Sequence, residues 1–294
     1  MVADVLLMLL GCASLYVGGD ALIRGCTSLG RRLQMSPLVI GLVLVAFGTS
    51  APELAVSLDA AVRGHGDLAA GNVVGSNLIN TGLALLVLTV LARLPSLPGL
   101  AERDLPVLLL LTLAGGLMLL DGRLQRWEGT LLLGAVVGFL IQVLRSGPVR
   151  ARSASAASAS RASLWKALLL TAVGVALLVI GGEAMVHSGV AIAQSLGMSE
   201  ATIAMTVTAA GTGIPEISAT LMALLRGHAA LALGNLVGSN IMNLALVLGL
   251  SALVVPLDTP GVTVTPIAVL VMLTLILWLG LFLRQGRQLG WSGD

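Results

Sequence analysis

Charged side chains are scarce in this sequence, and their scarcity excludes most soluble proteins. Asp, Glu, Lys and Arg make up only 10% of the 294 residues, whereas soluble domains average about 25%. Hydrophobic residues reach 57%, and the mean hydropathy is +1.02. The net charge of +2 is spread along the chain, without the basic block that typically binds nucleic acid. We therefore expect an integral membrane protein, surrounded by the lipid bilayer, with no nucleic-acid partner.

Cysteine and histidine are also rare, which excludes several kinds of site. The two cysteines, Cys12 and Cys26, flank one apolar segment and form no disulfide framework. We interpret them as small apolar residues within a helix. The sequence offers neither a nucleophile with its base nor a cluster of histidines, as an intramembrane enzyme would need. We expect no catalytic residues and no bound cofactor.

Long apolar segments dominate what is present. Because a helix needs about 20 mostly apolar residues to cross a bilayer, we predict nine spans: 5–23, 37–62, 68–92, 105–120, 128–144, 164–186, 201–225, 231–255 and 262–283. We expect the first span to be retained, since Asp4 stands where a cleavable signal peptide would carry Lys or Arg. A Ser-, Ala- and Arg-rich stretch predicts a flexible linker. The predicted domains are two transmembrane repeats, at 1–145 and 164–294, joined by the linker at 146–163.

Two sequence motifs occur twice in the chain, 163 residues apart. GTSAPE at 48–53 and GNVVGSNLIN at 71–80 return as GTGIPE at 211–216 and GNLVGSNIMN at 234–243. Between positions 46 and 80, 19 of 35 residues are identical at this offset. The motifs were therefore duplicated together with their structural surroundings.

The number of spans predicts that the repeats have opposite orientations. Five spans precede the linker, so the second repeat starts from the other side of the membrane, as in many secondary transporters. With the N-terminus outside, the inner loops carry 13 of the 16 Lys and Arg residues, so the linker should be cytoplasmic. At the same offset, the last span of the second repeat would begin where the chain ends. We expect an all-α polytopic membrane protein of two inverted five-helix repeats, the second lacking its last helix, with nine spans predicted and ten possible.

The first motif gathers polar groups at a weak point of an apolar helix. Gly48 weakens the helix through its backbone entropy, and Pro52 removes a hydrogen-bond donor. Carbonyl groups freed inside a membrane must line a cavity enclosed by protein or filled with water, and the carboxylate of Glu53 follows at once. The second copy repeats this with Glu216. Neither motif contains His or Cys, so these oxygen ligands indicate Ca²⁺, Na⁺ or Mg²⁺ and not zinc.

Two such carboxylates would together balance one Ca²⁺ or two Na⁺. In the absence of an ion, like charges would face each other in a medium of low dielectric constant, and one carboxylate would tend to bind a proton. We therefore expect ions and protons to compete for Glu53 and Glu216.

The second motif places Asn72, Ser76 and Asn80 on one helical face. Gly71 and Gly75 permit close approach of a neighbouring helix, and helix packing alone would explain a single copy. Two copies, each after a broken helix with a Glu, instead favour an oxygen cage. Its candidate members are Ser76, Asn80, Ser239 and Asn243.

Other repeated charges have simpler explanations. Asp20 and Glu183 occupy matched positions near span ends, where charged side chains reach the membrane interface. Arg63 and Arg226 also match, and each is explained as a cation at a helix C-terminus, before a glycine cap.

The doubled motifs, G-T-S-x-P-E and G-N-x-x-G-S-N, resemble those of the sodium/calcium exchanger family within the cation/calcium exchanger superfamily. The similarity covers most of the chain and is greatest to short prokaryotic members without a regulatory loop. It implies an antiporter in a prokaryotic inner membrane that exchanges Ca²⁺ for Na⁺ by alternating access. In that family, the first and sixth spans slide across a rigid core that holds four ion sites.

The resemblance also implies which residues bind ions. The Ca²⁺ ligands would be the carboxylates and backbone oxygens of Glu53, Glu216, Thr49 and Thr212. The two Na⁺ sites would use Ala46, Ser50 and Ser239 on one side, and Ala209 and Ser76 on the other. The middle site would contain Asn80 and Asn243.

Two positions depart from the family pattern. Gly213 stands where the pattern has Ser, and Asn243 stands where some members have Asp. Both weaken the expectation of coupling to three Na⁺, so a Ca²⁺/H⁺ or other cation/H⁺ antiporter on the same fold is the main alternative. A passive cation channel or a membrane scaffold with a vestigial site are further alternatives, although a channel needs weaker binding than two buried carboxylates would give.

Overall fold

The computed structural model describes residues 2–90, 97, 99–145, 161–198 and 211–288. Most of the predicted linker, the first part of the predicted span 201–225 and the predicted ligand Ala209 lie outside the described residues.

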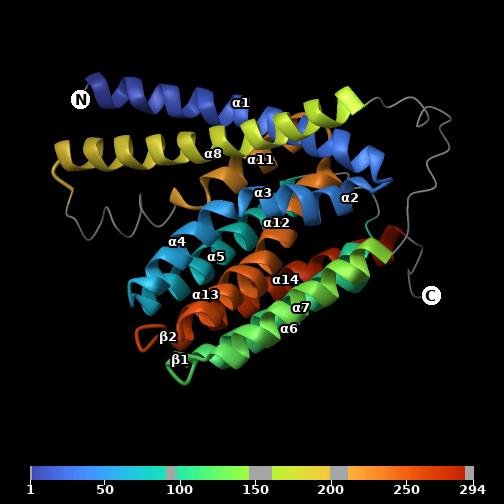
Figure 1. The fold of residues 1–294 in the computed structure, drawn as a ribbon. Coiled ribbons are helices and arrows are strands. Elements are labelled where there is room, and N and C mark those ends of the chain that lie inside the picture. Colours follow the sequence, from blue (N-terminus) through green and yellow to red (C-terminus); the bar gives the residue numbers. More distant parts are fainter. Residues whose placement is uncertain (1, 91–96, 98, 146–160, 199–210, 289–294) are drawn as a thin grey trace.

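Two long helices, α1 (Val2–Arg32) and α8 (Arg161–Ser195), lie side by side along one face of the molecule (Figure 1). They are antiparallel, because Gly11 meets Gly181 while Gly18 meets Gly174. A Cβ atom on Gly18 would lie 2.9 Å from the backbone nitrogen of Leu178. The helices are therefore in backbone contact, and a larger residue in this seam would push them apart.

The second predicted span is a broken helix. The segments α2 (Pro37–Val39), η1 (Ile40–Val45) and α3 (Ala46–Thr49) lead to a bend of 44°, after which α4 (Ala51–Val62) continues. Pro52 lies in the first turn of α4, where its missing N–H is tolerated. In the second copy, α11 (Ile214–Leu225) begins in the same way. Gly213 has φ −80° and ψ −4°, and Ser50 has φ −81° and ψ 2°. The predicted break at the first motif is confirmed.

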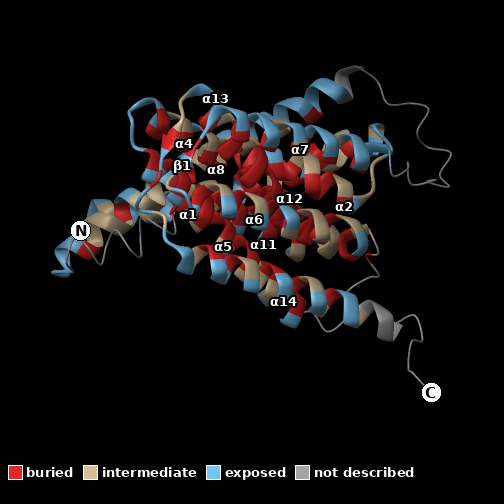
Figure 2. Ribbon diagram, turned by 90° about the horizontal axis from the view of Figure 1, so that it is seen from below, coloured by how far each residue is buried: buried red, intermediate tan, exposed pale blue. Residues whose placement is uncertain are grey.

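The helices of the second motif follow. They are α5 (Gly66–Val90) and α12 (Ala229–Met242), and α12 continues through η5 (Asn243–Val247) into α13 (Leu248–Val254). Figure 2 shows α12 in the buried centre of the molecule. Cβ atoms on Gly234 and Gly238 would lie 2.5 Å and 2.4 Å from backbone oxygens of the second predicted span. The predicted close approach is thus confirmed for this copy, whereas at Gly71 and Gly75 no described atom would come within 4 Å.

The remaining elements lie beside this core. They are η2 (Leu100–Asp104), α6 (Leu105–Leu119), α7 (Arg126–Arg145), α14 (Val264–Gln288) and two short strands, β1 (Arg123–Leu124) and β2 (Leu257–Asp258). The strands pair antiparallel, with Arg123 opposite Asp258. This ribbon ties the turn between α6 and α7 to the segment before α14.

Six helices in the described part of the chain are long and apolar enough to cross a membrane, and the bent pair makes seven. The predicted spans 105–120 and 201–225 correspond to shorter helices, α6 with 15 residues and α11 with 12 described residues. The all-helical, polytopic membrane architecture is confirmed, and the number of nine spans stays a prediction.

Candidate ion-binding site

Glu53 and Glu216 lie in the first turns of α4 and α11, and each is 0% exposed. Among the residues that the structure describes, none donates a hydrogen bond to their four carboxylate oxygens. The helix that carries Glu216, α11, packs against α3, which leads directly into the helix that carries Glu53. Because an unpaired buried charge is costly, this pair needs either a cation or a proton.

Hydroxyl groups from the two repeats meet in two places. Thr49 Oγ1 lies 3.2 Å from Ser239 Oγ, and Thr212 Oγ1 lies 3.2 Å from Ser76 Oγ. Positions 49 and 212 correspond at the 163-residue offset, as do positions 76 and 239. The two contacts are therefore one contact made twice, with the repeats exchanged.

The other predicted ligands lie on the same helices. The carbonyl oxygen of Ala46 accepts the N–H of Ser50 at 2.9 Å. The side chains of Ser50, Asn80 and Asn243 are buried, and no described residue bonds their polar atoms. Buried polar atoms are normally hydrogen-bonded. Because these oxygens have no such partner among the described residues, they are available to bind a cation. Ala209 lies outside the described residues.

Two asparagines support the helices that carry the buried carboxylates, a role that was not predicted from the sequence. Asn72 donates to Ser57 Oγ at 3.0 Å and to the backbone oxygen of Glu53 at 3.4 Å. In the second repeat, Asn235 donates to Thr220 Oγ1 at 3.1 Å. Ser57 and Thr220 occupy matched positions, so both copies have a hydroxyl group there. This shared hydroxyl group was the signal in the sequence that could have revealed the role of the two asparagines.

Asn235 also reaches across to the other repeat. Its amide oxygen accepts a hydrogen bond from Thr49 Oγ1 at 3.3 Å. One fully buried amide therefore links the helix that carries Glu216 to the end of α3, the first half of the bent span. It thus contacts one predicted ligand, Thr49, directly, and it fixes the helix of another, Glu216, through Thr220.

A second missed cluster joins α5 to α12. Asn77 donates to the backbone oxygen of Asn240 at 3.1 Å, and Asn240 donates to Thr81 Oγ1 at 2.8 Å. Positions 77 and 240 correspond at the 163-residue offset, so these asparagines meet where the repeats meet. Thr81 has no hydroxyl counterpart, because Leu244 occupies the matched position. The identity of the two asparagines was visible in the sequence, but their contact was not.

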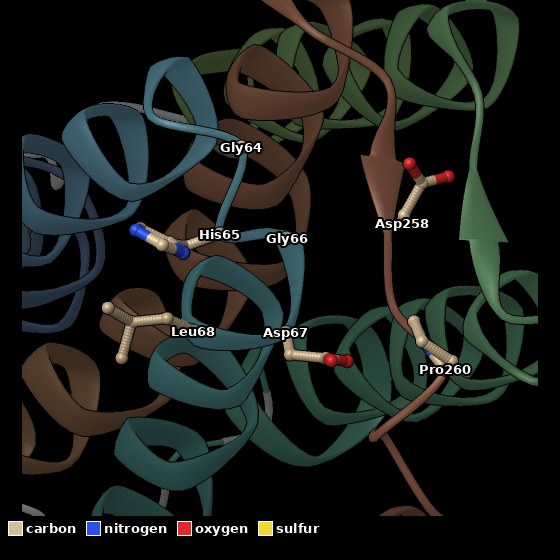
Figure 3. Close-up of a pocket in the computed structure, with 7 residues that line it drawn as sticks. All are labelled: Gly64, His65, Gly66, Asp67, Leu68, Asp258 and Pro260. Carbon is tan, nitrogen blue, oxygen red and sulfur yellow. The ribbon is translucent and has the colours of Figure 1, made fainter.

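A polar depression at the surface also contains acidic side chains, but they do not form an ion site (Figure 3). It has a volume of about 530 Å³ and is lined by His65, Asp67 and Asp258 among others. The side chains of Asp67 and Asp258 do not point toward a common centre. Asp67 accepts the N–H of Gly261 at 2.8 Å, and Asp258 pairs with Arg123 at 3.4 Å. Within the described ranges, no three His, Cys, Asp or Glu side chains gather to hold a metal. Asp67 and Asp258 instead connect neighbouring loops through these contacts.

Two helices that start at matched motifs, each with a buried carboxylate in its first turn, lie inside an all-helical membrane fold. This arrangement is that of a membrane cation carrier. The chain belongs to the sodium/calcium exchanger protein family, which it matches over residues 4–145 and 166–293. The family predicted from the motifs is confirmed. The protein is a transporter of the cation/calcium exchanger type and not an enzyme.

Relatives cover most of the chain. Inner membrane protein YrbG of Escherichia coli is 32% identical over 265 residues, which are 85% of this chain and 81% of YrbG. Sodium/calcium exchanger MaX1 of Methanosarcina acetivorans is 29% identical over 331 aligned positions, which cover 98% of this chain and 93% of MaX1. A structure of the sodium-calcium exchanger NCX_Mj, soaked with zero Na⁺ and Ca²⁺, has a TM-score of 0.82 at 28% identity. It covers 98% of this chain and 94% of that chain.

Proposed function

We propose that the protein is a secondary antiporter that exchanges Ca²⁺ for Na⁺ by alternating access. The observation that carries this proposal is the carboxylate pair of Glu53 and Glu216, which is fully buried and without a described hydrogen-bond donor. A charge of −2 balances one Ca²⁺ or two Na⁺, so the two ions would compete for one centre. Oxygen-only ligands suit both ions. The names of two relatives, MaX1 and NCX_Mj, support the same pair of ions.

The proposed ligands are those that the family resemblance implies. Ca²⁺ would bind the carboxylates and backbone oxygens of Glu53, Glu216, Thr49 and Thr212. Na⁺ would bind on one side to Ala46, Ser50 and Ser239, and on the other to Ala209 and Ser76. The amide oxygens of Asn80 and Asn243 would serve the middle site.

The proposed topology has nine spans in two inverted repeats. Residues 1–145 and 164–294 would form the repeats, the linker at 146–163 would be cytoplasmic, and the N-terminus would be outside. The positive-inside count and the inner-membrane location in the name of YrbG support a prokaryotic inner membrane. The α1–α8 pair would slide across the remaining helices to change the side from which the site is reached.

Vesicle transport tests this proposal. The purified protein is reconstituted into liposomes, and radiocalcium uptake is measured with an imposed Na⁺ gradient at equal pH on both sides. We expect uptake that requires the Na⁺ gradient and that is lost in Glu53→Gln and Glu216→Gln. Absence of uptake in the unaltered protein under a Na⁺ gradient would rule out this function.

A Ca²⁺/H⁺ antiporter is the second candidate. The observation that favours it is Gly213, which offers no side-chain oxygen where Ser50 offers one in the first repeat. A pH gradient imposed in Na⁺-free buffer separates the two candidates. Uptake under that gradient supports proton coupling, and uptake indifferent to pH excludes it.

A further inference from the structure

Within the part of the chain that the structure describes, an ion pair joins the α1–α8 pair to the other helices. The carboxylate of Asp20, on α1, pairs with Arg226 at the C-terminal end of α11. Arg24 supports it from one turn further along α1, at 2.8 Å. The side chain of Asp20 is only 21% exposed. The pair therefore links a helix proposed to slide to the helix that carries Glu216.

The repeat contains a second copy of both residues. At the 163-residue offset, Asp20 corresponds to Glu183 on α8, and Arg226 corresponds to Arg63 at the end of α4. The signs of the charges are kept. The backbone is kept as well, because each arginine ends its helix and is followed by a glycine with a positive φ, +80° in the first copy and +75° in the second.

The second copy of the ion pair is not formed in this structure. Arg63 pairs with Asp59 on its own helix at 2.8 Å, and Glu183 is exposed and makes no ion pair with any described residue. The contacts that α1 and α8 make with the other helices are also unequal in the two repeats. Gly19 of α1 lies against Ser218 in the middle of α11, whereas α8 packs against α11 and α3. The α1–α8 pair is therefore displaced toward the second repeat.

In a carrier with inverted repeats, the opposite state is reached when the two repeats exchange conformations. In that state, α8 would lie on α4 as α1 now lies on α11, and Glu183 would come to Arg63. Because α1 and α8 are in backbone contact along their seam, a slide that forms one ion pair breaks the other. The ends of α4 and α11 lie at opposite ends of the bundle: α5, which follows α4, starts against β2, while α12, which follows α11, packs on α2.

We propose that Asp20–Arg226 and Glu183–Arg63 are alternative latches, each formed when the opposite end of the carrier is open. This inference rests on the proposed alternating-access function. It assigns a shared purpose to four charged residues that helix capping and interfacial placement otherwise explain one at a time.

Cross-linking in membranes tests the two latches. In a Cys12→Ser, Cys26→Ser background, one protein carries Asp20→Cys with Arg226→Cys, and another carries Glu183→Cys with Arg63→Cys. A bifunctional thiol reagent, about as long as an Arg–Asp pair, is added. We expect both pairs to cross-link, although this structure contains only the first contact. The controls exchange the partners: Asp20→Cys with Arg63→Cys, and Glu183→Cys with Arg226→Cys, should not react.

The two latches should also oppose each other. Adding Asp20→Asn to the Glu183→Cys, Arg63→Cys protein removes the remaining latch and should speed its cross-linking about two- to fivefold, as expected for a partly exposed ion pair. Glu183→Gln should do the same for the Asp20→Cys, Arg226→Cys protein. If the Glu183–Arg63 pair reacts no faster than the exchanged controls while the unaltered protein transports ions, the latch proposal is wrong. If both pairs react but no gradient drives transport, the latches stand and the proposed function fails.

Discussion

The hydroxyl oxygens of Thr49 and Ser239 lie 3.2 Å apart, although 190 residues separate them in the chain. Thr49 ends the first half of a broken helix in one repeat, and Ser239 belongs to the second-motif helix of the other. The contact recurs between Thr212 and Ser76. Neither repeat can complete the candidate site alone, so a change in either repeat should alter ligands contributed by both.

Replacing Glu53 or Glu216 with Gln should stop exchange without unfolding the protein. The substitution keeps the size of the side chain and removes the charge that would balance the cation. Loss of one buried charge partner is worth about 3–5 kcal/mol, so Ca²⁺ uptake should fall about a hundredfold or more. Size-exclusion chromatography in detergent reports on folding.

Glu128→Gln is the matched control for these substitutions. Glu128 is also buried, but its carboxylate accepts the N–H of Gln125 at 2.8 Å, at the start of α7. Uptake should survive in this variant. Equal losses in Glu128→Gln and Glu53→Gln would contradict the assignment of Glu53 to the ion site.

Asn235→Ala should destabilise the protein more than Asn72→Ala. Asn235 is fully buried and bonds both Thr220 and Thr49, whereas Asn72 is only half-buried. Leaving buried partners unsatisfied costs about 1–3 kcal/mol. Thermal unfolding in detergent measures the loss, and its dependence on Ca²⁺ concentration measures the effect on binding.

A double-mutant cycle separates the role of this contact from general packing. Asn235→Ala and Thr220→Ala should be strongly non-additive, because their side chains bond at 3.1 Å. Additive losses would mean that the contact contributes little.

Gly174→Ala should weaken the packing of α1 on α8. A Cβ atom there would lie 2.5 Å from the backbone nitrogen of Leu22 and 2.9 Å from the backbone oxygen of Gly18. Overpacking of this kind costs about 1–3 kcal/mol. At Gly138, on α7, no atom of the described residues would come within 4 Å, so Gly138→Ala should be neutral or stabilising through helix propensity. Thermal unfolding of both variants makes the comparison, and equal stability would contradict the close seam.

Gly213→Ser should increase the apparent affinity for Na⁺ in transport. Gly213 and Ser50 have nearly the same backbone angles, so serine fits the local conformation and would place a hydroxyl where the first repeat has one. The Na⁺ concentration that gives half-maximal Ca²⁺ uptake should fall several-fold in Gly213→Ser. Gly213→Ala controls for the added carbon, and if both variants behave alike, the hydroxyl plays no part.

The broken helix and its buried carboxylates could be predicted because their causes are local. Gly48 and Pro52 weaken any helix, wherever it packs, and a Glu one residue after the proline follows the break. The duplication then extended the prediction to Glu216 without new information. The sequence also predicted the family that residues 4–145 and 166–293 match.

The contacts between repeats could not be predicted, because periodicity says which face of a helix is polar but not which helix it meets. Asn77 and Asn240 are identical in the two copies, yet only the packing of α5 on α12 shows that they bond each other. Similarly, Arg226 fitted a helix cap in the sequence, and its contact with Asp20 depends on where α1 lies across α11.

The two copies differ in helix type at a residue that is identical in both motifs. The π-helical segment η5 begins at Asn243, whereas α5 stays α-helical at Asn80. After these matched asparagines the sequences diverge, with Thr81 in one copy and Leu244 in the other. A motif comparison stops at the asparagine, so it could not reveal a change in helix type that begins there.

The seam between α1 and α8 has a consequence for how the molecule is made. During translation, α1 leaves the ribosome well before the helix that covers its glycine face, which begins only at Arg161. Until then, that face must rest against lipid or against a temporary neighbour. Pairing of α1 with α8 must therefore wait until the helices α2 to α7 have been made.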